Sequence, residues 1–188
     1  MQRRSFLRST AGAIGSVGLL GYVSTEKAAA QQTDLRVTND SGYNTVEYDI
    51  KMGNGNPDIS GEIEGGADHY TFDNAVKFER VLVTGAKSDY NPVSLYPEAL
   101  VTVDGYVTSQ SGTCVVESLW KDNQYDIWFA GDVDGTSSNE WGDNHDGGHA
   151  WGSINEGKTD KWNFDSGCYQ VRSFGNGFGT NRFTFNYD

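Results

Sequence analysis

The sequence predicts an all-β fold, an antiparallel β-sandwich composed of two related units. Apolar and polar residues alternate over short stretches such as residues 45–52, which is typical of strands with one buried face. No stretch after the N-terminal segment spaces its apolar residues at helical intervals. The chain also contains 24 Gly, which suit turns, and 5 Trp, 10 Tyr and 9 Phe, which favour strands around an aromatic core.

Residues 1–30 are predicted to be an export signal. Twin arginines precede an aromatic residue, a leucine and a base in Arg3-Arg4-Ser5-Phe6-Leu7-Arg8, which is the pattern of a Tat signal. A short apolar run over residues 11–23 follows, and Ala28-Ala29-Ala30 supplies the small residues of a cleavage site. We therefore expect a mature protein that is secreted or held at the cell surface, with no integral membrane segment.

The charge of the mature chain limits its partners. Four of the 14 basic residues and one of the 26 acidic residues lie in the signal, so residues 31–188 carry a net charge of −15. Such a chain repels nucleic acid and anionic lipid, because both bind through positive charge. Its self-repulsion is weak near 1 M salt, where the Debye length is about 3 Å. The composition therefore predicts a salt-adapted (halophilic) protein whose fold is less stable at low ionic strength.

The first predicted unit covers residues 34–107. Over residues 61–73 it contains a strand, the tight glycine turn Gly65-Gly66 and a second strand, because two alternating stretches flank the turn. The hairpin-type turn Asp104-Gly105 ends the unit. Outside this stretch, strands are expected where alternating or β-branched residues lie between turn signals, at residues 35–38, 45–52, 77–84, 93–96 and 99–103.

The second predicted unit, residues 112–188, repeats this order, with strands expected at residues 114–120, 124–130, 160–165 and 183–185. Tyr125-Asp126-Ile127 corresponds to Tyr48-Asp49-Ile50. Aromatic and acidic residues recur at one constant offset, with Asp160, Trp162 and Phe164 in the places of Asp68, Tyr70 and Phe72. This repetition predicts a tandem duplication, which would produce either two small sandwiches or two halves of one sandwich.

The motif that carries a resemblance is Gly61-x-Ile63-x-Gly65-Gly66-x-Asp68-x-Tyr70-x-Phe72, followed by Val101-Thr102-Val103-Asp104-Gly105. It resembles small Tat-exported haloarchaeal β-sandwich proteins of unknown function. It is also loosely similar to the pre-peptidase C-terminal type of β-sandwich domain. The resemblance covers about half of the mature chain and implies an extracellular β module, without catalytic residues to carry over.

Cys114 and Cys168 are the only cysteines, and in an exported protein two cysteines predict one disulfide. Asn39-Asp40-Ser41 is the one glycosylation sequon, which makes Asn39 a candidate glycan acceptor.

Residues 131–148 form an acidic loop rich in Asp, Asn and Gly. Clustered carboxylate and amide oxygens are the ligands that calcium prefers, so a structural calcium ion is one interpretation. A catalytic transition metal is a second, although Gly147-Gly148 opposes the helix that would bring two histidines to one face. The candidate metal ligands are Asp132, Asp134, Asp143, His145, Asp146 and His149. A solvated loop with no ligand is the simplest alternative.

Tryptophans near this loop suggest a third interpretation. Aromatic rings with adjacent polar groups suit the binding of sugar rings, and the candidates are Trp128, Trp141 and Trp151. No nucleophile elbow, zinc signature or phosphate-binding glycine loop is present in the sequence.

These observations predict a secreted, salt-adapted and non-enzymatic module that binds a glycan or a protein of the cell envelope. A small secreted metal-dependent hydrolase that uses the loop over residues 132–149 is the main alternative. An antimicrobial or toxin-like protein is a further one. No cofactor is required by any motif, and calcium is the one that the loop suggests.

Overall fold

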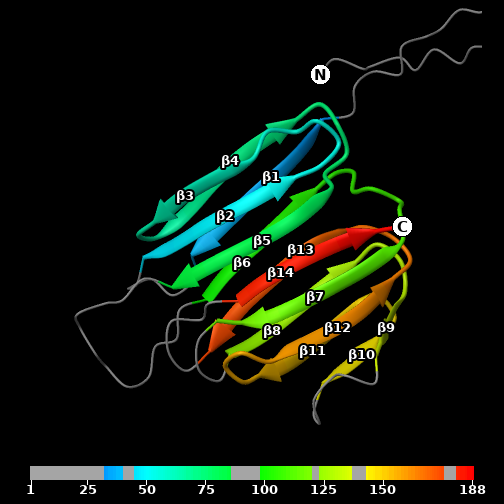
Figure 1. The fold of residues 1–188 in the computed structure, drawn as a ribbon. Helices are drawn as coiled ribbons and strands as arrows, with labels where there is room; N and C mark the ends of the chain where they lie inside the picture. Colours follow the sequence, from blue (N-terminus) through cyan, green and yellow to red (C-terminus); the bar gives the residue numbers. More distant parts are fainter. Residues whose placement is uncertain (1–31, 40–44, 86–97, 120–122, 137–142, 176–180) are drawn as a thin grey trace, which may run out of the picture.

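The fold is an antiparallel β-sandwich, as the sequence predicts. A computed structural model describes residues 32–39, 45–85, 98–119, 123–136, 143–175 and 181–188. Every regular element in these ranges is a β-strand, and the 14 strands form two seven-stranded antiparallel sheets (Figure 1). The export signal and the expected strand at residues 93–96 lie outside the described residues.

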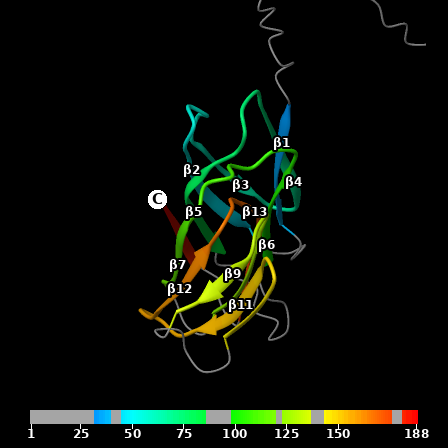
Figure 2. The same cartoon turned by 90° about the vertical axis from the view of Figure 1, so that its right-hand side faces the viewer.

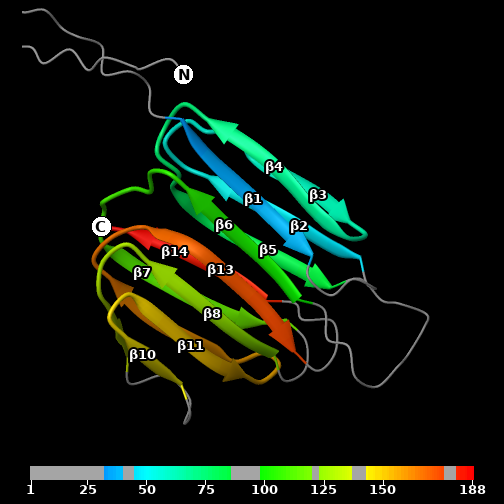
Figure 3. The ribbon, with the colours of Figure 1, turned by 180° about the vertical axis from the view of Figure 1, so that it is seen from behind.

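Sheet A contains the strands that face the viewer in Figure 3. Their order across the sheet is β10 (Asn144–Asp146), β11 (His149–Ile154), β8 (Asn123–Phe129), β13 (Cys168–Gly175), β6 (Glu98–Asp104), β1 (Thr33–Asn39) and β4 (Gly66–Phe72). The order in sheet B is β3 (Ile59–Ile63), β2 (Val46–Met52), β5 (Phe78–Gly85), β14 (Asn181–Tyr187), β7 (Gly112–Ser118), β12 (Thr159–Phe164) and β9 (Val133–Gly135).

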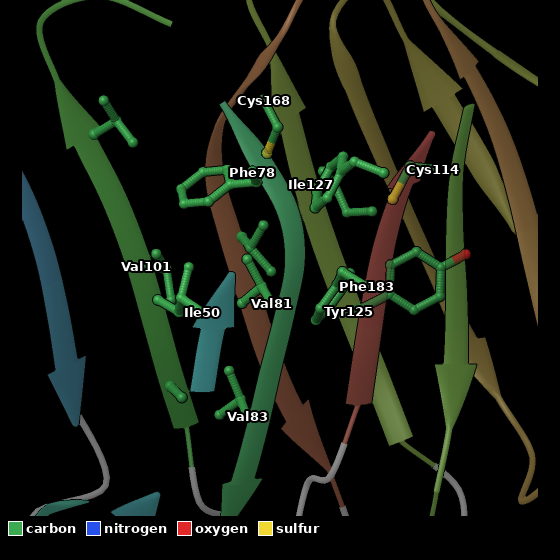
Figure 4. Close-up of a cluster of buried hydrophobic side chains, with 14 of the residues drawn as sticks. Ile50, Phe78, Val81, Val83, Val101, Cys114, Tyr125, Ile127, Cys168 and Phe183 are labelled. Carbon is green, nitrogen blue, oxygen red and sulfur yellow. The ribbon is translucent and has the colours of Figure 1, made fainter. Parts of the chain in front are cut away.

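The two sheets pack face to face, and Figure 2 shows them as two layers. Alternation along each strand sends one set of side chains between the layers, as in β7 and β8, where every second residue is buried. The core runs the length of the sandwich without a break, and Figure 4 shows its centre, where Val81 and Phe183 from sheet B face Val101 and Ile127 from sheet A.

Each half of the chain contributes three strands to each sheet, apart from the short strands β9 and β10. Sheet A joins β6 of the first half to β13 of the second, and sheet B joins β5 of the first half to β14 of the second. The predicted units, residues 34–107 and 112–188, therefore lie at opposite ends of one continuous sandwich (Figure 1).

The two halves have equivalent strands and registers. Strands β1 to β6 correspond in order to β7, β8, β11, β12, β13 and β14, and this correspondence exchanges sheet A with sheet B. Tyr48 lies opposite Gly61 between β2 and β3, just as Tyr125 lies opposite Gly152 between β8 and β11. A register shift occurs at the equivalent place in both halves. It lies next to the pair of Phe78 and Met52 in the first half and next to the pair of Cys168 and Phe129 in the second.

The disulfide prediction is wrong, because both cysteines are unpaired and buried. Cys114 lies on β7 in sheet B, and Cys168 lies on β13 in sheet A (Figure 4). A disulfide between packed sheets needs the two Cα atoms to come within about 4.4–6.8 Å of each other, and the structure leaves these two thiols apart. Burial raises the pKa of both thiols. The Sγ of Cys168 instead donates to the carbonyl of Gln170 at 3.3 Å.

Candidate binding site

The acidic loop forms one closed edge of the sandwich. Its described residues supply β9 and β10, which extend sheet B beyond β12 and sheet A beyond β11. The amide of Val133 in β9 donates to the carbonyl of Gly147, which follows β10, at 2.9 Å, and this bond links the two strands. The amide of Phe129 at the end of β8 donates to the carbonyl of Gly148 at 2.7 Å. Residues 137–142 of the loop, including Trp141, lie outside the described part of the chain.

The six predicted metal ligands do not converge. Within the described ranges, no group of three or more His, Cys, Asp or Glu residues could hold a metal ion. The hairpin of β10 and β11 instead separates the candidates, because successive residues of a strand point to opposite faces. Asp146 and His149 are directly paired in this hairpin and lie on the outer face of sheet A, and Asp132 is exposed.

Asp143 and His145 lie on the inner side of β10. A Cβ atom added at Gly152 would collide with the carboxylate of Asp143. The Nε2 of His145 is 3.6 Å from Oδ1 of Asp134, and its ring meets the edge of Trp162 at a centroid distance of 5.9 Å. These side chains therefore cover the end of the core.

Three aromatic rings form a stack on the outer face of sheet A. The ring of His149 lies parallel to Trp128, with centroids 4.3 Å apart and planes 5° apart. Between His149 and its other neighbour, Trp151, the ring centroids are 4.6 Å apart and the planes are tilted by 32°. All three side chains are half-buried, so parts of both indoles are accessible to solvent. Two of the three tryptophans named from the sequence thus reach one surface.

Strand register explains why these rings meet. His149 of β11 lies directly opposite Trp128 of β8, and Trp151 lies opposite Asp126. Directly opposite side chains on one face of an antiparallel pair have Cβ atoms about 4.5–5.5 Å apart, which is stacking distance for rings. From the sequence alone His149 is a candidate metal ligand only, because the register that places its ring between the two indoles cannot be read from the sequence.

A charged group supports the stack at its base. Oδ1 of Asp126 lies 3.3 Å from Nε2 of His149, and its Oδ2 lies 3.3 Å from Nη1 of Arg172. The guanidinium group of Arg172 in turn lies over the ring of Phe174, 4.6 Å from its centroid. Asp126 is mostly buried, with a side-chain exposure of 14%. It therefore holds the imidazole in place between the indoles.

In the described residues, the equivalent positions of the other half carry no aromatic rings. Residues at the positions of Trp128 and Trp151 are Lys51 and Ser60 on the outer face of sheet B. Asp126 corresponds to Asp49, which pairs with Arg80 at 2.8 Å. The charged group is thus present in both halves, whereas the indoles occur in one. The fold of this outer face therefore does not depend on an aromatic stack.

A buried polar cluster lies beneath β9 and β10. The hydroxyl of Tyr125 donates to Oδ2 of Asp160 at 2.8 Å, and Nε1 of Trp162 donates to the same hydroxyl at 3.0 Å. Asp160 is fully buried and Trp162 is 1% exposed. Burial, followed by the charge of Asp160, raises the pKa of Tyr125 far above its ordinary value.

The first half contains the equivalent cluster at the sandwich's other end. The hydroxyl of Tyr48 donates to Oδ2 of Asp68 at 2.6 Å and also bonds to the hydroxyl of Tyr70. Asp68 and Tyr70 are half-buried rather than buried. The residues that recur at a constant offset in the sequence thus form the same kind of hydrogen-bonded cluster in both halves. Only in the second half do further strands cover this cluster.

The predicted glycan acceptor is engaged in the fold. Asn39 is 4% exposed, and its Nδ2 donates to the carbonyl of Ile63 at 2.9 Å. Because a glycan would be attached to this nitrogen, the folded chain does not present Asn39 as an acceptor.

Comparisons of the chain with protein-family models, with curated proteins and with solved structures found no match. A search of the described residues for a helix long and apolar enough to span a membrane found none.

Proposed function

We propose that the protein is a secreted, non-enzymatic module that binds a glycan of the cell envelope through the stack of Trp128, His149 and Trp151. The observation that carries this proposal is a set of partly exposed aromatic rings on one outer face, where the described residues at the equivalent positions of the other half have none. Indole rings offer flat apolar surfaces to the C–H faces of sugars, and neighbouring polar groups bond the hydroxyls.

The surroundings of the stack supply such polar groups. Asn144 lies opposite Trp151 on β10, and Gln170 lies opposite Trp128 on β13. Gln124 and Ser153 are paired on the same face and are exposed. These uncharged side chains donate and accept hydrogen bonds, which matches the hydroxyl groups of a sugar. A face of this kind suits a neutral glycan better than an anionic one, given the net charge of −15 after residue 30.

The place of action follows from the sequence. The twin-arginine segment at residues 3–8 and the small residues before residue 31 support export by the Tat route. The acidic composition supports a salt-rich exterior. Together with the resemblance to exported haloarchaeal β-sandwich proteins, these features support a protein that is released or stays on the envelope.

The proposal is tested with residues 31–188, produced in high salt and mixed with polysaccharides extracted from a salt-adapted cell envelope. Binding is measured by sedimentation with the insoluble fraction and by tryptophan fluorescence with the soluble fraction. We expect Trp128→Lys with Trp151→Ser to abolish binding, because the stack is then replaced by the residues of the equivalent face. The melting temperature of this variant is measured in parallel.

Tyr106→Ala is the matched control. Tyr106 is 47% exposed and has no part in the stack, so its removal takes away one exposed aromatic ring without touching the site. The control is expected to bind as the unchanged protein does. Equal binding by the double variant and the unchanged protein would refute the proposal.

A further inference from the structure

In the described part of the chain, one edge of sheet B is open where its counterpart is covered. β3 is the last strand of this sheet, and among the described residues it pairs with β2 alone. Its equivalent in the second half, β11, pairs with β8 on one side and with β10 on the other. The architecture therefore accepts an additional antiparallel strand at this position, and the second half supplies it from its own chain.

We propose that the β3 edge binds an extended basic segment of a partner protein, which adds to sheet B as a further strand. An exposed strand edge offers unpaired backbone groups, and an extended peptide satisfies them by main-chain hydrogen bonds. The site lies at the end of the sandwich opposite β9 and β10, and so it is separate from the aromatic stack (Figure 1).

The charge of this edge indicates the chemistry of the partner. Three exposed glutamates lie on or beside β3, whereas the equivalent positions in the second half are uncharged: Glu47, Glu62 and Glu64 correspond to Gln124, Ser153 and Asn155. Both halves experience the same solvent. General adaptation to salt therefore does not account for acids at these three positions in one half only.

Two of these glutamates oppose each other directly. Glu47 on β2 is the register partner of Glu62 on β3. Like charges in directly opposite positions destabilise a sheet. No ion pair joins Glu47, Glu62 or Glu64 to a basic residue in the described part of the chain. Lysine or arginine side chains of an added strand would relieve this repulsion, since alternate residues of that strand lie over the same face.

The experiment uses residues 31–188 and a blocked, fluorescein-labelled nine-residue peptide that alternates lysine with threonine. Fluorescence polarisation is measured at the lowest salt concentration at which circular dichroism shows the protein folded. We expect saturable binding that weakens as salt is added. The variant Glu62→Ser with Glu64→Asn, which copies the second half, is expected to bind about tenfold more weakly, since each exposed ion pair contributes modestly.

Two control peptides separate strand addition from attraction of charge alone. A peptide that alternates glutamate with threonine is expected not to bind. The lysine peptide methylated on alternate backbone nitrogens keeps its charge but loses the donors of one edge, so it is expected not to bind either. Equal affinity for the methylated peptide, or for the Glu62 and Glu64 variant, would overturn the proposal, as would absence of binding by the lysine peptide.

Discussion

Replacing Tyr125 by phenylalanine removes two hydrogen bonds from the fully buried cluster beneath β9 and β10. The hydroxyl of Tyr125 bonds to the carboxylate of Asp160 and accepts from Nε1 of Trp162. A hydrogen bond to a charged group contributes about 1.5–3 kcal/mol, and an ordinary one about 1 kcal/mol. Since Tyr125, Asp160 and Trp162 are at most 1% exposed, these groups have little access to solvent in the folded state. We therefore expect Tyr125→Phe to lower the free energy of unfolding by about 3 kcal/mol.

The equivalent change in the first half is the matched control. Tyr48→Phe removes the bonds to Asp68 and Tyr70, but these two side chains are half-buried and can bond to water instead. The cost there is expected to be about 1 kcal/mol, the usual net value of one hydrogen bond. The same chemical change in the same fold thus measures the effect of covering a polar cluster.

Both variants are compared with the unchanged protein by urea unfolding at one fixed, high salt concentration. Urea is preferred because guanidinium chloride would itself change the ionic strength. The slope of free energy against urea shows whether the unfolded states are comparable. If Tyr125→Phe costs no more than Tyr48→Phe, the view that burial sets the strength of these bonds is refuted.

Two further predictions concern the buried titratable groups. Burial raises the pKa of Tyr48, Tyr125 and Tyr187 and of both cysteine thiols, so the unfolded chain loses these protons at lower pH than the folded chain does. These groups therefore add no pH dependence of stability below about pH 8, and stability is expected to fall progressively above it, through the unfolded pKa values near 8.5 for Cys and 10 for Tyr. A melting temperature that does not change between about pH 8 and 11 would contradict this. Without reductant, a thiol reagent is expected to leave the folded protein unlabelled and to label two cysteines in urea, because Cys114 and Cys168 are unpaired and buried; an unlabelled denatured chain would mean that they form a disulfide.

The fold was predictable because its signals are local. Alternation over residues 45–52 predicted β2 at Val46–Met52, and the glycine turn at Gly65-Gly66 marked the boundary between β3 and β4. The repetition in the sequence also pointed to equivalent residues in two halves. Whether two strands of facing sheets bring their cysteines within disulfide distance is not a local property, however, and this is why the disulfide prediction failed for Cys114 and Cys168.

The candidate site was predictable only in part. Exposed tryptophans beside polar residues could be named from the sequence, but the stack depends on the register of β8 with β11, which brings His149 between Trp128 and Trp151. Register depends on the whole sheet and on the turns that join its strands. A metal site was one interpretation of the acidic loop, because clustered carboxylate and amide oxygens are the ligands that calcium prefers. Alternation along β10 and β11 instead sends His145 and His149 to opposite faces.

The junction between the two halves has a consequence for a chain of half the length. In the full chain, β6 pairs with β13 and β5 pairs with β14, and these two pairs are equivalent to each other. A single half would expose both junction strands, and a second identical half could cover them through the same two pairings, related by a twofold axis. A protein of this design could thus have begun as a homodimer, whose fusion into one chain allowed the two outer faces to diverge.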